Sequence, residues 1–225
     1  MKRALSLFVT VAVCLQGWAW QGVGDAEADD YSKWPLAFSV EYLPSRLVYV
    51  GEDREKDDYQ SFGGLALTMT GVLRISTTQP LYLEAGLGFQ RSYYSVDIDY
   101  ADDGWNFSLK EEMRLMSLKM PVSLAYVYSV SNSRMVIVPY AGLRFRYNVW
   151  GQLLLNNIDR NLFDIDDMEG DEDSLAKRFQ VGWQAGAKVR FGGRFFVGAA
   201  YGTDFNEISH DVKVHEAQFS LGIVF

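Results

Sequence analysis

The sequence predicts an all-β fold, an eight-stranded antiparallel transmembrane β-barrel. Three observations predict it: eight segments alternate apolar and polar residues with period two, the connections between them alternate in length, and the chain ends at Phe225 on a strongly apolar segment. Apolar residues on one face and polar residues on the other suit strands with lipid outside and a polar lumen inside. Fifteen per cent aromatic residues and twenty glycines also favour strands and tight turns.

Each of the eight segments carries one apolar face, and most exceed the roughly nine to eleven residues that cross a bilayer at a tilt. In order they are Leu36–Leu43, Gly64–Ile75, Leu81–Arg91, Met113–Tyr128, Met135–Val149, Phe179–Phe191, Phe195–Phe205 and a terminal strand that ends at Phe225. Pro121 and Pro139 each remove one donor from the strand ladder. Near them we expect either shifted strand boundaries or locally irregular pairing.

The connections between these segments alternate between long and short along the chain. Pro44–Phe62, Ser92–Glu112 and Trp150–Arg178 are long and Asn206–Val214 is intermediate, whereas Ser76–Pro80, Ser129–Arg134 and Gly192–Arg194 are short. Barrels of the outer membrane place both termini and their tight turns in the periplasm and their longer loops outside the cell. A soluble β-sandwich has no reason to sort its loops in this way. The parity therefore predicts an outer-membrane protein of a Gram-negative bacterium.

Charged residues fall on the face opposite the apolar one. They form a predicted lumen charge network: Glu41, Arg74, Glu84, Lys119, Arg144, Arg146, Lys188, Arg190, Asp204 and Glu216. An Arg or Lys facing lipid at mid-bilayer costs roughly 2–4 kcal/mol, so this face must line the lumen. Because the lumen of an eight-stranded barrel is just wide enough for side chains, we expect a paired network and no open pore. A second interpretation is that the basic members hold an anion.

The N-terminus predicts a secretory signal peptide. Lys2 and Arg3 precede a largely apolar stretch from Ala4 to Leu15, and Gly17-Trp18-Ala19 supplies small residues at the −3 and −1 positions of a cleavage site. We expect residues 1–19 to be removed, residues 20–34 to form a short periplasmic segment, and residues 35–225 to form the barrel domain.

Cleavage would also change the cysteine content and the charge. The only cysteine, Cys14, lies in the predicted signal peptide, and Val13 before it argues against a lipoprotein site, so the mature chain has no disulfide. Removing Lys2 and Arg3 leaves 19 basic against 29 acidic residues, a net charge of −10 in place of −8. This acidity argues against nucleic acid as a partner.

Acidic residues concentrate in the long loops. Weak candidates for Ca²⁺ ligands are Asp164, Asp166, Asp167, Asp171 and Asp173, whose spacing does not match an EF-hand. Bridging to lipopolysaccharide phosphates through divalent ions is a second interpretation. A solvated acidic loop is the third and the preferred one, so we assign no metal and no cofactor.

A catalytic site is conceivable near the last loop. Ser209, His210 and Asp211 lie in that loop, and His215 and Glu216 begin the final strand. Outer-membrane lipid A deacylases place a His and a Ser on one barrel face near the extracellular rim, so a hydrolase is one alternative. Adjacent strand residues face opposite sides, however, and we favour polar rim residues without an enzymatic role.

Two segments resemble a known family. Leu118–Tyr126 is similar to the L-x-I-P-L-x-L-x-Y strand of the small outer-membrane β-barrel family that includes PorT-like, porin-family proteins. Val138–Tyr147 resembles its next strand, in which P-Y-x-G-x-G is usual, although Leu143 here precedes Arg144 where a glycine is common. The resemblance covers about Trp34 to Phe225. It implies location and fold, and because members differ in role it assigns no functional residues.

The sequence thus predicts a non-enzymatic outer-membrane barrel with a plugged polar lumen and acidic extracellular loops, in a structural or interaction role. Alternatives are a PorT-like accessory of a protein-secretion machine, a rim-located lipid A-modifying hydrolase and a small diffusion channel. Expected partners are outer-membrane lipid or lipopolysaccharide, the barrel-assembly machinery through the strand that ends at Phe225, and an unidentified protein.

Overall fold

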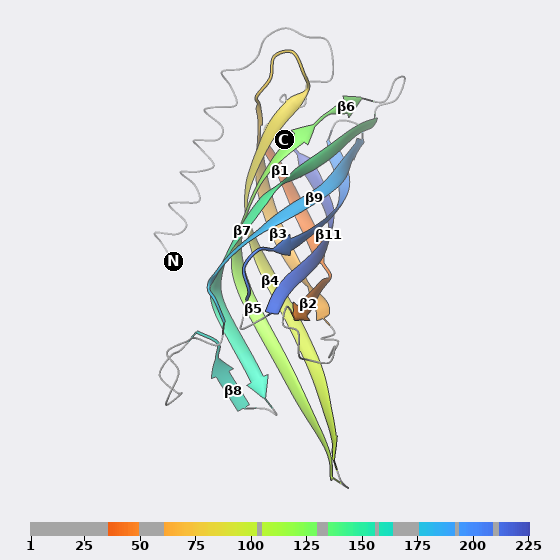
Figure 1. Ribbon diagram of the computed structural model, residues 1–225. Coiled ribbons are helices and arrows are strands. Elements are labelled where there is room, and N and C mark those ends of the chain that lie inside the picture. Colours follow the sequence, from red (N-terminus) through yellow and green to blue (C-terminus); the bar gives the residue numbers. More distant parts are fainter. Residues whose placement is uncertain are drawn as a thin grey trace.

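The computed structural model shows one antiparallel sheet that closes on itself as a barrel (Figure 1). The structure describes residues 36–49, 61–102, 105–129, 135–155, 158–163, 176–191, 194–208 and 212–225. Within these ranges no helix is long and apolar enough to cross a membrane.

Eleven strands are assigned in the described residues. They are β1 (Leu36–Leu43), β2 (Ser45–Tyr49), β3 (Ser61–Arg74), β4 (Leu81–Asp102), β5 (Trp105–Tyr126), β6 (Tyr128–Ser129), β7 (Met135–Leu155), β8 (Ile158–Asn161), β9 (Phe179–Phe191), β10 (Phe195–Asp204) and β11 (Val212–Val224). The order around the barrel is β1-β3-β4-β5-β7-β9-β10-β11, and a pairing between β1 and β11 closes it. The predicted eight-stranded antiparallel barrel is therefore confirmed.

The three shorter strands are extensions of this barrel. β2 continues the path of β1 beyond Pro44 and pairs with the start of β11. β6 continues β5 beyond Val127 along β7, and β8 folds back on the far end of β7. None of them adds a strand to the circumference.

The terminal strand closes the barrel as its alternation predicts. Ala37 pairs with Val224 and Tyr42 with Phe219, so β1 and β11 match over six residue pairs. The Phe225 N–H also donates to the Leu36 carbonyl at 2.8 Å. The sheet consequently has no free edge along the barrel wall.

Alternation along each strand separates the two faces. On β1, Phe38, Val40 and Tyr42 are 39–50% exposed, whereas Ser39 and Glu41 are at most 6% exposed. A soluble protein would place these apolar residues inside, because burial removes them from water. Here the apolar face points outward and the polar face lines the lumen, as the sequence predicts.

The two barrel ends are unlike. The hairpin of β4 and β5 projects far beyond the other strands at one end, and the C-terminus lies at the opposite end (Figure 1). The turn of residues 75–80 connects β3 and β4 at the end with the C-terminus, and the paired ends of β9 and β10 at Phe191 and Phe195 lie at that end too. In an outer-membrane barrel the end with the termini faces the periplasm and the projecting end faces outward.

Several loop predictions are too long. Most of the segment predicted as a loop from Ser92 to Glu112 is strand, because β4 and β5 stay paired as far as Asp102 and Trp105. In this extension Ile98 lies opposite Leu109 and Tyr100 opposite Phe107, residue types that favour strands. The predicted loops after Pro44 and Trp150 likewise contain β2, the end of β7 and β8, and Val212–Val214 belongs to β11.

Two irregularities explain other boundary differences. β3 extends back to Ser61 through a bulge, because Ser61 pairs with Tyr94 and Gly63 with Tyr93, which leaves one extra residue between them. Gly63 has a φ of 93°, which is strained for residues other than glycine. In β7, Ser117 pairs with Asn148 and Met116 with Trp150, so Val149 is an extra residue. Val149 and Trp150 both face outward. Before this bulge the residues of β7 that face the lumen have even numbers, and beyond it they have odd numbers.

The prolines interrupt pairing locally. The ladder between β4 and β5 is continuous except opposite Met120 and Pro121, where two residue pairs are missing. Opposite Pro139, β5 ends at Tyr126 and pairing resumes only in β6 at Tyr128. The irregular-pairing interpretation is therefore the one the structure supports, since a proline has no N–H to donate.

Candidate functional site

Most of the charged residues on the inner face of the barrel form ion pairs across the lumen, in three groups. Lys119 on β5 donates from Nζ to Glu41 Oε2 on β1 at 2.7 Å and to Gln218 Oε1 at 3.2 Å. Ser39 donates to Glu41 Oε1 at 3.2 Å. The side chains of Lys119 and Glu41 are 1% and 4% exposed. This pair joins strands that are not neighbours in the sheet.

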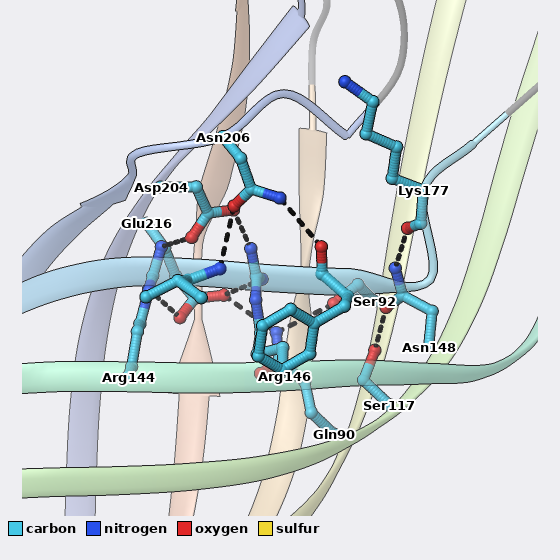
Figure 2. Close-up of polar contacts among 12 residues, drawn as sticks. Gln90, Ser92, Ser117, Arg144, Arg146, Asn148, Lys177, Asp204, Asn206 and Glu216 are labelled. Atoms are coloured by element: carbon cyan, nitrogen blue, oxygen red, sulfur yellow. Dashed lines mark hydrogen bonds and ion pairs between the residues drawn. The ribbon is translucent and has the colours of Figure 1, made fainter.

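Four residues form a second group, shown in Figure 2. Arg144 on β7 donates to Asp204 Oδ1 at 3.0 Å and to Glu216 Oε1 at 2.6 Å. Arg146, two residues further along β7, contacts the second oxygens of Asp204 and Glu216. Gln90 Nε2 donates to Glu216 Oε2 at 2.8 Å. Two guanidinium groups thus share two carboxylates, and the charge of the group is zero.

A third pair lies nearer the end of the barrel that holds the C-terminus. Lys188 on β9 donates to Glu84 Oε2 at 2.6 Å, and its Nζ lies 4.8 Å from the ring centre of Tyr140. Cation and ring at this separation attract each other. A cavity of about 30 Å³ lies between this pair and the pair of Lys119 and Glu41, with room for only one or two water molecules.

Two predicted members lie apart from these groups. Arg74 ends β3 and donates from Nε to the Ser76 carbonyl at 2.8 Å, so its guanidinium caps the turn to β4. The structure therefore does not place Arg74 in the network, because the strand ends before its side chain reaches the others. Arg190 is buried on the inner face of β9, and none of the three groups above includes it.

Because these charged side chains are buried, each needs its partner to offset the cost of leaving water. Each ion pays a desolvation penalty of several kcal/mol, which its partner offsets only in good geometry. The seven residues Glu41, Glu84, Lys119, Arg144, Arg146, Asp204 and Glu216 are all at most 4% exposed. Loss of a single partner would therefore leave an isolated charge in a place with little water.

An apolar cluster covers the network on the side of the projecting β4–β5 hairpin, and we call it the extracellular cluster after the orientation that the loop lengths predict. Its members are Leu47, Tyr94, Leu115, Leu153, Leu162, Phe163, Ala176, Ile208, Val212 and Val214. The inner faces of five strands supply part of it, and residues after β8 and before β9 and β11 fold over the barrel mouth to supply the rest. Arg178 stacks on Phe163 at 4.3 Å from the ring centre. Sequence reasoning missed this cluster, because the loop residues in it follow no period.

A second apolar cluster covers the network on the side of the C-terminus. Val72, Tyr82, Ala125, Val127, Val136, Val138 and Tyr140 are its buried members. All of them occupy inward positions of β3, β4, β5 and β7 or the break between β5 and β6. The three charged groups and the two apolar clusters thus occupy successive levels of the lumen, and the buried Arg190 lies opposite Val136 of the second cluster.

The residues considered for catalysis do not form one group. Ser209, His210 and Asp211 lie outside the described residues. Glu216 points into the lumen, whereas His215 faces outward and its Nδ1 lies 2.6 Å from the Tyr201 hydroxyl. Because the two neighbours face opposite sides, His215 and Glu216 cannot act on the same substrate.

The predicted metal ligands remain a prediction. Asp164, Asp166, Asp167, Asp171 and Asp173 lie outside the described residues. In the described part of the chain, no three His, Cys, Asp or Glu side chains gather where they could hold a metal ion.

Known proteins resemble this chain in family and in fold. A family model described as "Outer membrane protein beta-barrel domain" matches residues 26–209. Among curated proteins none matches the chain.

Similar solved structures include small barrels of low sequence identity. Neisserial surface protein A is 14% identical, with a TM-score of 0.49 over 84% of this chain and 97% of that one. The outer membrane enzyme PagL is 10% identical, with a TM-score of 0.47 over 83% and 98%. The attachment invasion locus protein of Yersinia pestis is 12% identical, with a TM-score of 0.45 over 85% and 99%.

Proposed function

Because the chain belongs to the outer membrane protein β-barrel domain family, it is an outer-membrane protein, and we propose that it acts there by contact and without transport or catalysis. The observation that carries the proposal is the layered lumen. Three groups of ion pairs close the middle of the barrel, and an apolar cluster lies on either side of them. A solute would have to break buried ion pairs to pass, which is costly.

The projecting hairpin supports a contact role. β4 and β5 are 22 residues each, about twice what crosses a bilayer. Their last paired residues lie far beyond the other strands (Figure 1). A paired ribbon of this length extends the sheet toward partners outside the membrane without loosening the barrel.

A PorT-like accessory of a protein-secretion machine is the second candidate function. It has the same supporting observation, because an accessory of this kind acts through protein contacts that a projecting ribbon can make. The hydrolase alternative has less support, since His215 hydrogen-bonds to Tyr201 and is separated from Glu216 by the barrel wall. The diffusion-channel alternative conflicts with the layered lumen.

Two further partners belong to this proposal. The apolar outer band would be in contact with outer-membrane lipid, and the strand that ends at Phe225 would be recognised by the barrel-assembly machinery. Removal of residues 1–19 as a signal peptide would bring the chain to that machinery from the inner membrane.

Shortening the hairpin separates these functions. Replacing residues 96–111 by Asn-Gly keeps the pair Ser95–Glu112 and joins it with a tight turn. For a secretion accessory we expect cargo secretion to fall as far as it does on complete deletion of the protein. Full secretion from the shortened variant would argue against a role of the hairpin, and lipid A of altered mass after complete deletion would revive the hydrolase alternative.

A further inference from the structure

The outer face of the barrel carries a basic and aromatic group at its extracellular edge. Val214 and Glu216 point into the lumen with at most 1% exposure, so Lys213 and His215 between and beside them face outward on β11. On β2, Ser45 and Leu47 are buried and Arg46 is exposed. These basic residues therefore lie on the surface that meets lipid, not in the lumen.

Strand register brings the group together. His215 lies directly opposite Arg46. Lys213 lies opposite Val48, one step further along the strands toward the end of the barrel with the projecting hairpin. On the other side of β11, His215 lies opposite Thr203 of β10. Tyr201 reaches His215 Nδ1 at 2.6 Å from that strand, and the Trp183 ring packs edge-on against Tyr201 with centres 6.1 Å apart.

The position of the group relative to the membrane is given by its neighbours. From His215 toward the periplasm, the next outward residues of β11 are Ala217, Phe219, Leu221 and Ile223, all apolar. Arg46 and Lys213 therefore sit where the apolar band ends, at the level of lipid headgroups. No outward position of β2, β10 or β11 carries Asp or Glu, so this surface attracts anions.

Small side chains lie beside the group toward the membrane centre. Ala185 and Ala217 flank Tyr201 on the neighbouring strands, and Ala187 and Ala199 lie opposite each other one step closer to the periplasm. An acyl chain can approach the sheet closely over alanines, whereas Phe219 and Trp183 would hold it away. A headgroup site and a place for its acyl chain are thus continuous on one surface.

We propose that Arg46, Lys213, His215 and Tyr201 bind a phosphate group of lipid A in the outer leaflet, with one acyl chain lying over Ala185, Ala199 and Ala217. Lipid A suits the site because it places phosphates at the edge of the apolar band in the leaflet that this barrel end reaches. The inference rests on the proposed orientation, in which the long loops face outward.

Binding of bisphosphorylated lipid A to the mature protein in detergent micelles tests the site, with the affinity measured by native mass spectrometry. A basic residue near an anionic lipid surface contributes about fivefold in affinity. We therefore expect Arg46→Gln and Lys213→Gln each to weaken binding about fivefold, and the double variant about 25-fold. The matched control is Arg91→Gln, which removes an exposed, outward charge midway along β4, opposite Leu65, and should change the affinity less than twofold.

Two further arms address the ligand and the acyl chain. Lipid A lacking its phosphates should bind the wild type as weakly as bisphosphorylated lipid A binds the double variant. Ala199→Leu should weaken binding of bisphosphorylated lipid A without changing the heat-modifiable gel mobility that reports a folded barrel.

The lipid A site and the orientation of the barrel are tested by different measurements. Equal losses in Arg91→Gln and Arg46→Gln, or equal binding of phosphatidylglycerol and lipid A, would reduce the effect to general surface charge and overturn the site. Orientation is tested by Glu207→Cys, a new cysteine in a mature chain that is predicted to have none. Labelling of Cys at this position by an impermeant maleimide in intact cells supports the orientation, and its failure overturns both proposals.

Discussion

The ion pair between Glu41 and Lys119 offers a direct test of whether the lumen behaves as a dry core. Lys119→Met would leave the Glu41 carboxylate buried with the Ser39 hydroxyl as its remaining donor. Glu41→Gln would leave the Lys119 ammonium with Gln218 Oε1 at 3.2 Å. Breaking a buried pair by removing one partner costs about 3–5 kcal/mol of unfolding free energy.

The double variant should behave differently from the sum of the two. With both charges gone, the desolvation penalty of both ions is also gone, and a pair replaced by neutral side chains of similar size is often close to neutral. We therefore expect the double variant to lie within about 2 kcal/mol of the wild type. Unfolding in urea, followed by tryptophan fluorescence of barrels refolded into lipid vesicles, measures each free energy.

A more exposed ion pair on the same barrel supplies the control. Arg114 contacts Glu112 at 3.0 Å, and their side chains are 35% and 18% exposed. Such pairs contribute about 0–1 kcal/mol, so Arg114→Gln should cost no more than that. If Lys119→Met costs as little as Arg114→Gln and the double variant is additive, the lumen is hydrated and the reasoning from burial is wrong.

Three more predictions concern packing and assembly. A Cβ on Gly142 would overlap the Val122 carbonyl oxygen, so Gly142→Leu should abolish heat-modifiable mobility on gels, whereas its lipid-facing neighbour should tolerate Ala141→Leu. Deleting Phe225 removes its hydrogen bond to Leu36 and the terminal aromatic ring. The amount of folded barrel in cells should then fall by more than the yield of refolding into lipid vesicles, and equal losses in both would contradict recognition by the assembly machinery. Phe163→Ala should cost about 3–5 kcal/mol in urea unfolding, and an unchanged midpoint would mean that the extracellular cluster adds no stability.

The fold could be predicted because lipid and lumen impose a strict period of two. Phe179–Phe191 matches β9 at both ends, and Leu36–Leu43 matches β1, since neither contains a bulge or an internal proline. Prediction was wrong where the period changes for local reasons. The bulge at Val149 places two successive residues outward, and an alternation count stops there although β7 continues to Leu155.

The extent of the projecting hairpin could not be predicted from composition. Asp97, Asp99 and Asp102 are typical of loops, but each stands opposite a residue of β5 in continuous register. Strand pairing is a property of two segments together, and a test applied to one segment at a time misses it.

The pairing of the lumen charges could not be predicted from the sequence. Parity alone placed Glu41, Lys119 and Glu216 inside, but Glu216 lies 72 residues from Arg144, and only closure of the barrel brings them within 2.6 Å. The extracellular cluster had no advance signal at all. Leu162, Phe163 and Ile208 belong to irregular segments, and their burial depends on how those segments fold over the barrel mouth.

Conductance in planar lipid bilayers tests the central claim most directly. For a barrel whose lumen is closed by ion pairs between two apolar layers, purified protein should insert without steady current steps. The double variant of Glu41→Gln and Lys119→Met should also remain closed, because the group of Arg144, Arg146, Asp204 and Glu216 still blocks the path. Steady, uniform steps from the wild type would show an open pore and contradict the account.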